Sequence, residues 1–279
     1  MTRIQTESGL ASILVHVDLA PSAVERGRLA MSLADQHGAH LIGVAAEQQL
    51  LEIYSDMSVS VSATASEEER ERVEKDLGAA RRIFDKAVGS RNDVEWRSCV
   101  TDPERFLIQQ ARAADLVVIG RRPSSEAADG GLGVRPGSIA LECGRPILVV
   151  PAGADFLAAQ KVVVAWKDTR EARRAVHDAL PILKRADEVV VMTAAAASRD
   201  GGAEDVSIWL DRHGVRSRVS IHTGDVDHIA ENLLGLADDI GADLIVSGAY
   251  GHSRTREWFF GGVTRDLLRS PRHCLFMSH

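Results

Sequence analysis

The sequence predicts an α/β chain built from two tandem five-stranded parallel-sheet sandwiches. Three observations predict this: short apolar runs alternate with helix-length amphipathic segments, the whole series occurs twice, and one seven-residue string returns almost unchanged. Short runs rich in Val and Ile are typical of strands buried on both faces, and their alternation with helices is typical of βαβ units. A chain of 279 residues then divides into two domains of ordinary size.

The first half contains four apolar runs that we interpret as strands. These are Ile13–Asp18, the run from His40, Ala114–Gly120 (ADLVVIG) and Pro146–Val150. A helical pattern from Ser22 to about His37 separates the first two runs. After the second run, a Ser-rich stretch leads into a charged helical segment, where Ser66 and Glu69 fit a capping box that would begin the helix.

The second half repeats this series. Its apolar runs are Val162–Lys167, the run from Glu188, Ala242–Gly248 (ADLIVSG) and His273–Ser278. A helical pattern follows the first of these runs, from Thr169 to about Leu183. The segment 151–160, which contains a proline, a glycine and four alanines, is a plausible linker, so we expect domains at residues 1–155 and 156–279.

The composition excludes several classes of protein. Hydrophobic residues make up 45% and charged residues 26%, which is typical of a globular chain with a real core. A net charge of −7 argues against general binding to nucleic acid or to anionic membranes. No stretch has the length and apolarity of a membrane-spanning helix, and the N-terminus does not resemble a signal peptide. The three widely spaced cysteines suggest reduced thiols, so we expect a cytoplasmic protein.

The densest chemical signal lies near the C-terminus. Gly248 and Gly251 follow a predicted strand, nine residues intervene, and Gly261 and Gly262 then open a predicted helix. In open parallel sheets, ligands bind outside the carboxyl ends of the strands. Glycine lets backbone amides approach an anion, and a helix N-terminus favours phosphate. This spacing favours a phosphate site, and the alternative is that the glycines serve only tight turns.

The string GAYG, a nine-residue spacer and GGVT resemble the G-x-x-G-x9-G-[ST] signature of the universal stress proteins. The resemblance implies a Rossmann-like fold of the adenine nucleotide alpha hydrolase-like type, with five parallel strands. Nucleotide-binding members of that family hold ATP with this loop, and the adenine lies near the ends of the first two strands. The two halves together resemble a tandem, UspA-like member.

Carried onto the second half, the resemblance implies one nucleotide site. Its residues would be Lys167, Asp168 and Met192 around the base and ribose, and Gly248, Gly251, Gly261, Gly262, Val263 and Thr264 around the phosphates. Two positions depart from the family pattern. Lys167 stands where the family commonly has Asp, with Asp168 one residue later, and Gly262 stands where Ser or Thr is expected.

The first half carries a degenerate version of this site. The matching positions are Asp18, Val44, Gly120, Gly137 and Ser138. Pro123 occupies the place of the second glycine, and proline has no N–H and cannot adopt a positive φ. Arg121 and Arg122 follow Gly120 and could instead hold an anion by bidentate contacts.

No catalytic machinery is evident in the sequence. None of the ten histidines has the spacing of a metal site, and neither a nucleophile elbow nor a P-loop occurs. Efficient hydrolysis needs a positioned base or a metal as well as binding. We therefore assign no catalytic residue and no metal ligand, and favour binding over catalysis.

Three functions stay open. The leading one is a cytoplasmic universal stress protein that binds ATP or a related adenine nucleotide, with Mg²⁺ as a candidate companion, and acts as a stress sensor or regulator. The second is an interaction scaffold of the same fold without nucleotide, and the third is a slow ATPase. The partners expected are the nucleotide and an unidentified protein. The resemblance further implies pairing of the two domains through their last strands, and a homodimer is a further expectation.

Overall fold

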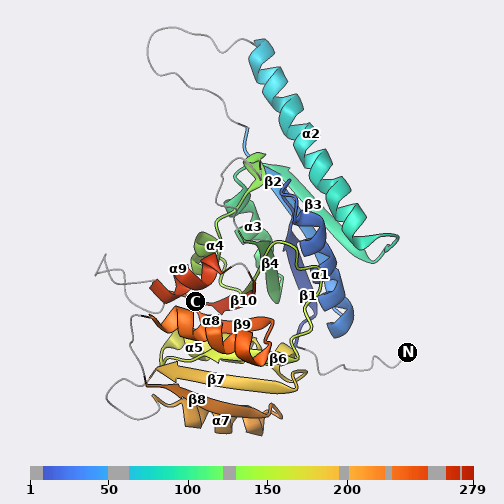
Figure 1. Cartoon of the computed structure of the whole chain (residues 1–279). Helices are drawn as coiled ribbons and strands as arrows, with labels where there is room; N and C mark the ends of the chain where they lie inside the picture. The colour runs from blue at the N-terminus through green and yellow to red at the C-terminus, as the bar shows by residue number, and fades with distance from the viewer. Residues whose placement is uncertain are drawn as a thin grey trace, which may run out of the picture.

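The computed structural model describes residues 9–49, 63–121, 130–194, 201–223, 228–250, 262–270 and 272–279. The first half consists, in chain order, of β1 (Ser12–His16), α1 (Ala23–His37), β2 (His40–Glu47), α2 (Ala63–Val88), β3 (Val94–Val100), α3 (Pro103–Ala111), β4 (Leu116–Gly120), the 3₁₀ turn η2 (Gly130–Leu132), α4 (Pro136–Glu142) and β5 (Ile147–Val150). The second half consists of β6 (Lys161–Ala165), α5 (Arg170–Asp178), α6 (Leu180–Leu183), β7 (Glu188–Ala194), α7 (Ala203–Arg212), β8 (Ser217–His222), α8 (Ile229–Ile240), β9 (Leu244–Gly248), α9 (Gly262–Arg269) and β10 (Cys274–Ser278). In Figure 1 the first half, coloured blue to green, lies largely above the second half, coloured yellow to red.

The strands of the described part of the chain form one ten-stranded sheet in the order β3-β2-β1-β4-β5-β10-β9-β6-β7-β8. Each half has the same internal order, in which its first strand lies between its second and fourth strands. Neighbouring strands are parallel throughout, except that β5 and β10 are antiparallel. This confirms the predicted α/β class with parallel strands, and it shows that the two five-stranded halves join into one sheet.

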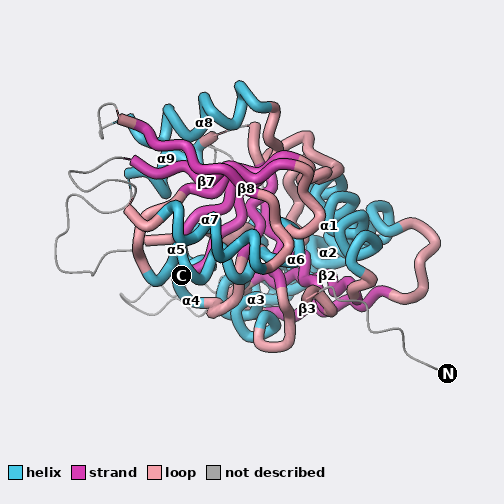
Figure 2. Tube along the Cα trace, turned by 90° about the horizontal axis from the view of Figure 1, so that it is seen from below, coloured by secondary structure: helices cyan, strands magenta, loops and turns pink. Residues whose placement is uncertain are grey.

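Helices cover both faces of this sheet, as the tube in Figure 2 shows. One apolar cluster gathers residues of α1, α2, α5 and α7, and a second gathers residues of α3, α4, α8 and α9. Buried parallel strands need this cover because both of their faces are apolar. The repeated run of apolar residues therefore folds as two similar three-layer units.

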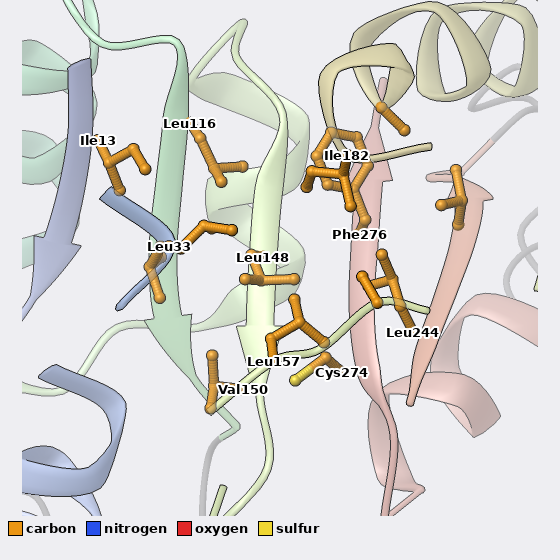
Figure 3. Close-up of a cluster of buried hydrophobic side chains, with 14 of the residues drawn as sticks. Ile13, Leu33, Leu116, Leu148, Val150, Leu157, Ile182, Leu244, Cys274 and Phe276 are labelled. Atoms are coloured by element: carbon orange, nitrogen blue, oxygen red, sulfur yellow. The ribbon is translucent and has the colours of Figure 1, made fainter. Parts of the chain in front are cut away.

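The core continues across the seam between the two halves. Leu148 of β5 lies opposite Phe276 of β10 in the antiparallel register, and both are fully buried. Figure 3 shows these side chains in one layer with Leu116 on one side and Leu244 on the other. These are the two strands for which the resemblance implies pairing within the chain.

A repeated aspartate ties each half together at the amino ends of its strands. Asp115 Oδ2 accepts hydrogen bonds from the amides of Ala11 and Ser12, at 2.8 and 3.0 Å. Asp243 Oδ2, at the same place in the second half, accepts from the amides of Ala158 and Ala159. The repeated Ala-Asp-Leu string thus has a structural reason: its carboxylate orders the backbone that enters the central strand.

Two predicted helices differ from the structure, one in where it begins and the other in being divided. Helix α2 begins at Ala63, so Ser66 lies inside the helix and does not begin it; Glu69 pairs instead with Arg72 one turn later, at 2.8 Å. This pairing satisfies the carboxylate along the helix surface. The helix predicted from Thr169 to Leu183 is divided into α5 and α6. Pro181 lies in the first turn of α6, where its missing N–H is tolerated, whereas it cannot continue the hydrogen bonds of α5.

Candidate functional site

The strand order creates one candidate crevice in each half. Order reverses between β1 and β4 in the first half and between β6 and β9 in the second. Ligands of open α/β sheets bind outside the carboxyl ends of the strands at such a reversal. Because β5 and β10 are antiparallel, the strands of the two halves run in opposite directions. The carboxyl ends of the first half's strands therefore lie at one end of the sheet, and those of the second half's strands lie at the other end.

An ion pair fills the crevice of the first half. Asp18 follows β1 and is only 6% exposed, and its Oδ1 lies 2.8 Å from Nη2 of Arg26 on α1. Arg26 Nε also donates to the carbonyl of His16, at 3.0 Å. The guanidinium lies directly on Gly120, the last residue of β4, where a Cβ would collide with it. Asp18 and Gly120, two residues of the degenerate site predicted in the first half, therefore both contact Arg26.

The turn η2 closes this crevice from outside. Nε2 of His16 donates to the carbonyl of Leu132 at 2.9 Å, and the Leu132 side chain is fully buried. Burial lowers the pKa of His16 to about 4, although the nearby Asp18 carboxylate works in the opposite direction. Burial alone would raise the pKa of Asp18, but the charge and hydrogen bond of the Arg26 guanidinium hold it below its usual value. Neutral His16 and the Asp18–Arg26 ion pair thus form one buried network.

Glu47 completes the cover of the first half. It ends β2, is fully buried and accepts a hydrogen bond from Arg72 of α2 at 2.6 Å. Gly131 packs closely on the Glu47 carboxylate, and a Cβ at this position would push that side chain aside. Burial raises the pKa of Glu47, although its hydrogen bond with Arg72 acts in the opposite direction.

The remaining predicted residues of the first half lie around this closed crevice. Val44 is buried in β2, beside His16 in the register, and its carbonyl accepts from the amide of Val17. Gly137 and Ser138 lie in the first turn of α4. A Cβ at Gly137 would lie 2.5 Å from the hydroxyl of Tyr250, so this glycine faces the second half of the chain.

The equivalent place in the second half exposes its polar residues. Lys167 and Asp168 follow β6 and are both exposed. Oδ1 of Asp168 lies 2.6 Å from Nη2 of Arg173 on α5. An aspartate after the first strand is therefore paired with an arginine of the next helix in both halves, but only the first pair is buried. Thr169 caps α5, since its Oγ1 accepts from the amide of Ala172 at 3.3 Å.

The strand register brings three predicted regions to one edge of the sheet. Ala165, the last residue of β6, is paired with Met192 of β7 and with Ser247 of β9, so Met192, Lys167 and Gly248 lie at or near the carboxyl ends of neighbouring strands. Met192 is buried, and its carbonyl accepts from the amide of Trp166 at 2.8 Å. The side chains therefore differ: Lys167 faces solvent while Met192 belongs to the core.

Gly248 has a packing role of its own. A Cβ there would lie 2.6 Å from the backbone nitrogen of Ala172, in the first turn of α5. Backbone cannot move away as a flexible side chain could, so this position requires glycine whether or not a ligand binds. The absent side chain lets α5 approach the end of β9.

Helix α9 begins at Gly262, whose position is exposed and has open space where a Cβ would stand. Val263 is half-buried and Thr264 is buried. An exposed first turn offers backbone amides to an anion. The predicted Gly251 and Gly261 lie outside the described residues.

The structure adds residues that the sequence reasoning missed. Arg26, Glu47 and Leu132 close the first crevice, and Trp166 in the second half donates from its indole to the carbonyl of Gly201 at 3.0 Å. One signal was available: His16 stands inside an apolar run that predicts a buried strand, and a buried imidazole needs a partner.

The prediction that Arg121 holds an anion is wrong. Its Nη1 donates to the carbonyl of Leu267 at 2.7 Å and its Nη2 to the carbonyl of His273 at 3.0 Å. These bonds direct the guanidinium across the seam to the second half. Arg122 and Pro123 lie outside the described residues.

The described ranges contain neither a metal-binding cluster nor a membrane-spanning helix. Within them, no group of three or more His, Cys, Asp or Glu side chains is arranged to hold a metal ion. No helix among these residues is both long enough and apolar enough to cross a membrane.

Comparison with known proteins points to one family, although no family model matches the chain. A universal stress protein of Synechocystis is 27% identical over 164 residues, covering 56% of this chain and 54% of that protein, so the chain spans about half its length. The crystal structure of a universal stress protein from Archaeoglobus fulgidus matches with a TM-score of 0.68 at 16% identity, covering 95% of this chain and 94% of that one. A functionally unknown protein of Pseudomonas aeruginosa matches with a TM-score of 0.57 at 14% identity, covering 96% and 92%. The chain therefore has the fold of a universal stress protein and resembles a curated member of that family in sequence.

Proposed function

We propose that this chain is a tandem universal stress protein, with domains at residues 1–155 and 156–279, that binds an adenine nucleotide in its second domain. Its role would be that of a stress-linked regulator in the cytoplasm, with the nucleotide as a ligand. One observation carries the proposal: the two equivalent crevices differ. The first is filled by buried side chains of its own domain, whereas the second presents exposed polar residues and an exposed helix start.

In the second domain the phosphates would lie at the start of α9. The open space at Gly262 permits close approach to the backbone amides of the first turn, and the helix dipole favours negative charge there. Gly248, Gly251, Gly261 and Val263 would complete this cradle. Thr264 is buried, so its contribution would come from its backbone amide.

The base and ribose would lie beside the ends of β6 and β7. Met192 supplies an apolar wall, and Lys167 and Asp168 supply polar groups at the exposed rim. A ribose hydroxyl would compete with Arg173 for the Asp168 carboxylate, which is exposed and therefore exchangeable at low cost. Mg²⁺ would be held by the phosphates, with no dedicated protein ligand proposed.

A pair of variants at Gly262 tests this site. Gly262→Asp places a carboxylate where the phosphates would lie, while Gly262→Asn is its neutral match in size. Aspartate near a helix N-terminus supports folding, so a loss of binding would reflect repulsion of the ligand and not loss of the helix. We expect Gly262→Asn to keep most of the affinity for ATP and Gly262→Asp to lose it.

Nucleotide-dependent melting gives the first measurement and calorimetric titration the second. ATP at 100 times its dissociation constant should stabilise the wild-type protein by about 2.7 kcal/mol. The proposal fails if millimolar ATP, AMP and cyclic AMP leave the wild-type melting temperature unchanged. It also fails if the Asp and Asn variants bind ATP equally well.

A specific observation favours a second candidate, an interaction scaffold without nucleotide. Lys167 stands where the first domain has Asp18, and the neighbouring Asp168 is already paired with Arg173. The melting experiment separates the two candidates, because a scaffold of this kind would show no shift with any adenine nucleotide.

A further inference from the structure

Residues of the first domain hold both flanks of the second domain's proposed phosphate loop. The loop leaves β9 through Tyr250 and enters α9 at Gly262. The residues between, 251–261, lie outside the described part of the chain. What the structure does describe is how each flank is fixed.

Tyr250 fixes the upstream flank. Its backbone has a φ of +53°, in the left-handed region that few residues other than glycine adopt. Its half-buried side chain reaches the first turn of α4, where the hydroxyl fits only because position 137 has no side chain. A Cβ at Gly137 would lie 2.5 Å from the hydroxyl oxygen but 3.5 Å from the ring carbon that carries it. The close fit thus depends on one oxygen atom and one glycine.

Arg121 fixes the downstream flank. It follows β4 and donates to the carbonyls of Leu267, in the last turn of α9, and His273, just before β10. Burial lowers the pKa of Arg121 to about 10, so the guanidinium remains charged at neutral pH. A cation at this end of a helix satisfies its free carbonyls and complements the helix dipole.

These two contacts come from positions that correspond to the signature in the first domain. Arg121 directly follows Gly120, and Gly137 belongs to the Gly-Ser pair that resembles the end of the signature. The crevice between them is closed by Arg26 and Leu132. Two residues at or beside the first domain's signature positions, Arg121 and Gly137, are therefore in contact with the second domain.

We propose that Arg121 and Gly137 are positioning residues of the first domain that hold Tyr250 and helix α9, the described flanks of the second domain's nucleotide site, in place as a brace. Helix α9 has eight residues and is about 12 Å long, so fixing its C-terminal turn also fixes the direction of its N-terminus. Tyr250, docked against Gly137, fixes the point where the loop leaves β9. This inference rests on the proposed nucleotide binding and assigns the first domain a part in it.

The contact between Gly137 and Tyr250 allows a test by rescue. Gly137→Ala adds the colliding Cβ, while alanine in a helix is itself favourable to folding. We expect Gly137→Ala to raise the dissociation constant for ATP by about fivefold or more, in the usual range of coupling between sites. Adding Tyr250→Phe removes the oxygen, leaves an ordinary contact to the ring, and should return the affinity to that of Tyr250→Phe alone. Equal affinity of Gly137→Ala and wild type would overturn the brace at this flank.

Arg121→Ala tests the other flank against a matched control. Asp115→Ala also removes two hydrogen bonds between a side chain and backbone groups, but these lie at the amino ends of the first domain's strands. We expect both variants to melt at lower temperature, and only Arg121→Ala to weaken ATP binding measured well below both melting temperatures. If the two variants bind ATP alike, Arg121 is purely structural and the inference is wrong.

The outcomes separate this inference from the function on which it rests. If wild-type protein binds none of the nucleotides, the proposed function fails and the brace fails with it. If wild type binds ATP and all brace variants bind it equally, the nucleotide site stands and the brace alone is refuted.

Discussion

Lowering the pH from about 7.5 to about 5 should destabilise this protein through His16. The imidazole ends β1, is 1% exposed, and has a pKa lowered to about 4 from an ordinary value of 6.5. Between these two pKa values the unfolded chain binds a proton at this residue and the folded chain does not. Stability from His16 is therefore complete above pH 6.5 and is lost progressively as the pH falls towards 4.

The size of this effect follows from the two pKa values. The difference between a pKa of 6.5 in the unfolded chain and about 4 in the folded chain corresponds to about 3 kcal/mol when the pH is below both. At pH 5 the unfolded state is almost fully protonated and the folded state is mostly neutral, so about 2 kcal/mol is lost. Asp18 is ionised in both states over this range and adds nothing to the slope there, although its lowered pKa matters in stronger acid.

Urea unfolding at the two pH values gives the assay, with His16→Gln as the comparison. Glutamine can still donate to the Leu132 carbonyl but does not titrate. His37 is also buried, with a pKa lowered to about 4, and it titrates in both proteins, so its effect cancels in the difference. The wild type should lose about 2 kcal/mol more than His16→Gln between the two pH values. Parallel losses in the two proteins would refute a buried neutral His16.

Two further predictions concern packing at the two crevices. Arg26→Met should lower the free energy of unfolding in urea by about 3–5 kcal/mol because it leaves Asp18 buried without its partner. Adding Asp18→Asn should recover most of that loss. No recovery would mean that Arg26 acts through packing alone. Gly248→Ala should lower stability by about 1–3 kcal/mol in thermal unfolding, since its Cβ would press on the backbone of Ala172; an unchanged melting temperature would show that α5 can shift away.

The central strands could be predicted from sequence because burial on both faces leaves a continuous apolar run. The runs at Ile13–Asp18 and Val162–Lys167 contain β1 and β6 almost entirely. The third strand of each half, β3 and β8, has no such run, although five strands per half were expected. Both are edge strands of the sheet, where every side chain is half-buried or exposed and polar residues interrupt the apolar pattern.

The candidate site was predictable in its residue types but not in its packing. The glycine spacing draws attention to the end of β9 because few structural demands require so many glycines there. The glycine spacing does not reveal that Gly248 also lets helix α5 pack closely against the end of β9, or that Arg121 donates to a carbonyl of α9. Those facts depend on residues that approach one another only after the sheet has formed.

The α/β class and the repeat can be predicted from the residues alone, because both follow from local periodicity: buried strands and amphipathic helices bury their apolar faces in only a few ways. Tertiary structure decided that β5 and β10 join antiparallel, so that the two crevices lie at opposite ends of one sheet. It also decided that the first crevice is closed. Arg26 reaches His16 from the next helix, and Leu132 comes from a turn more than a hundred residues away. A contact of the range of His16 with Leu132 leaves no periodic mark in the sequence.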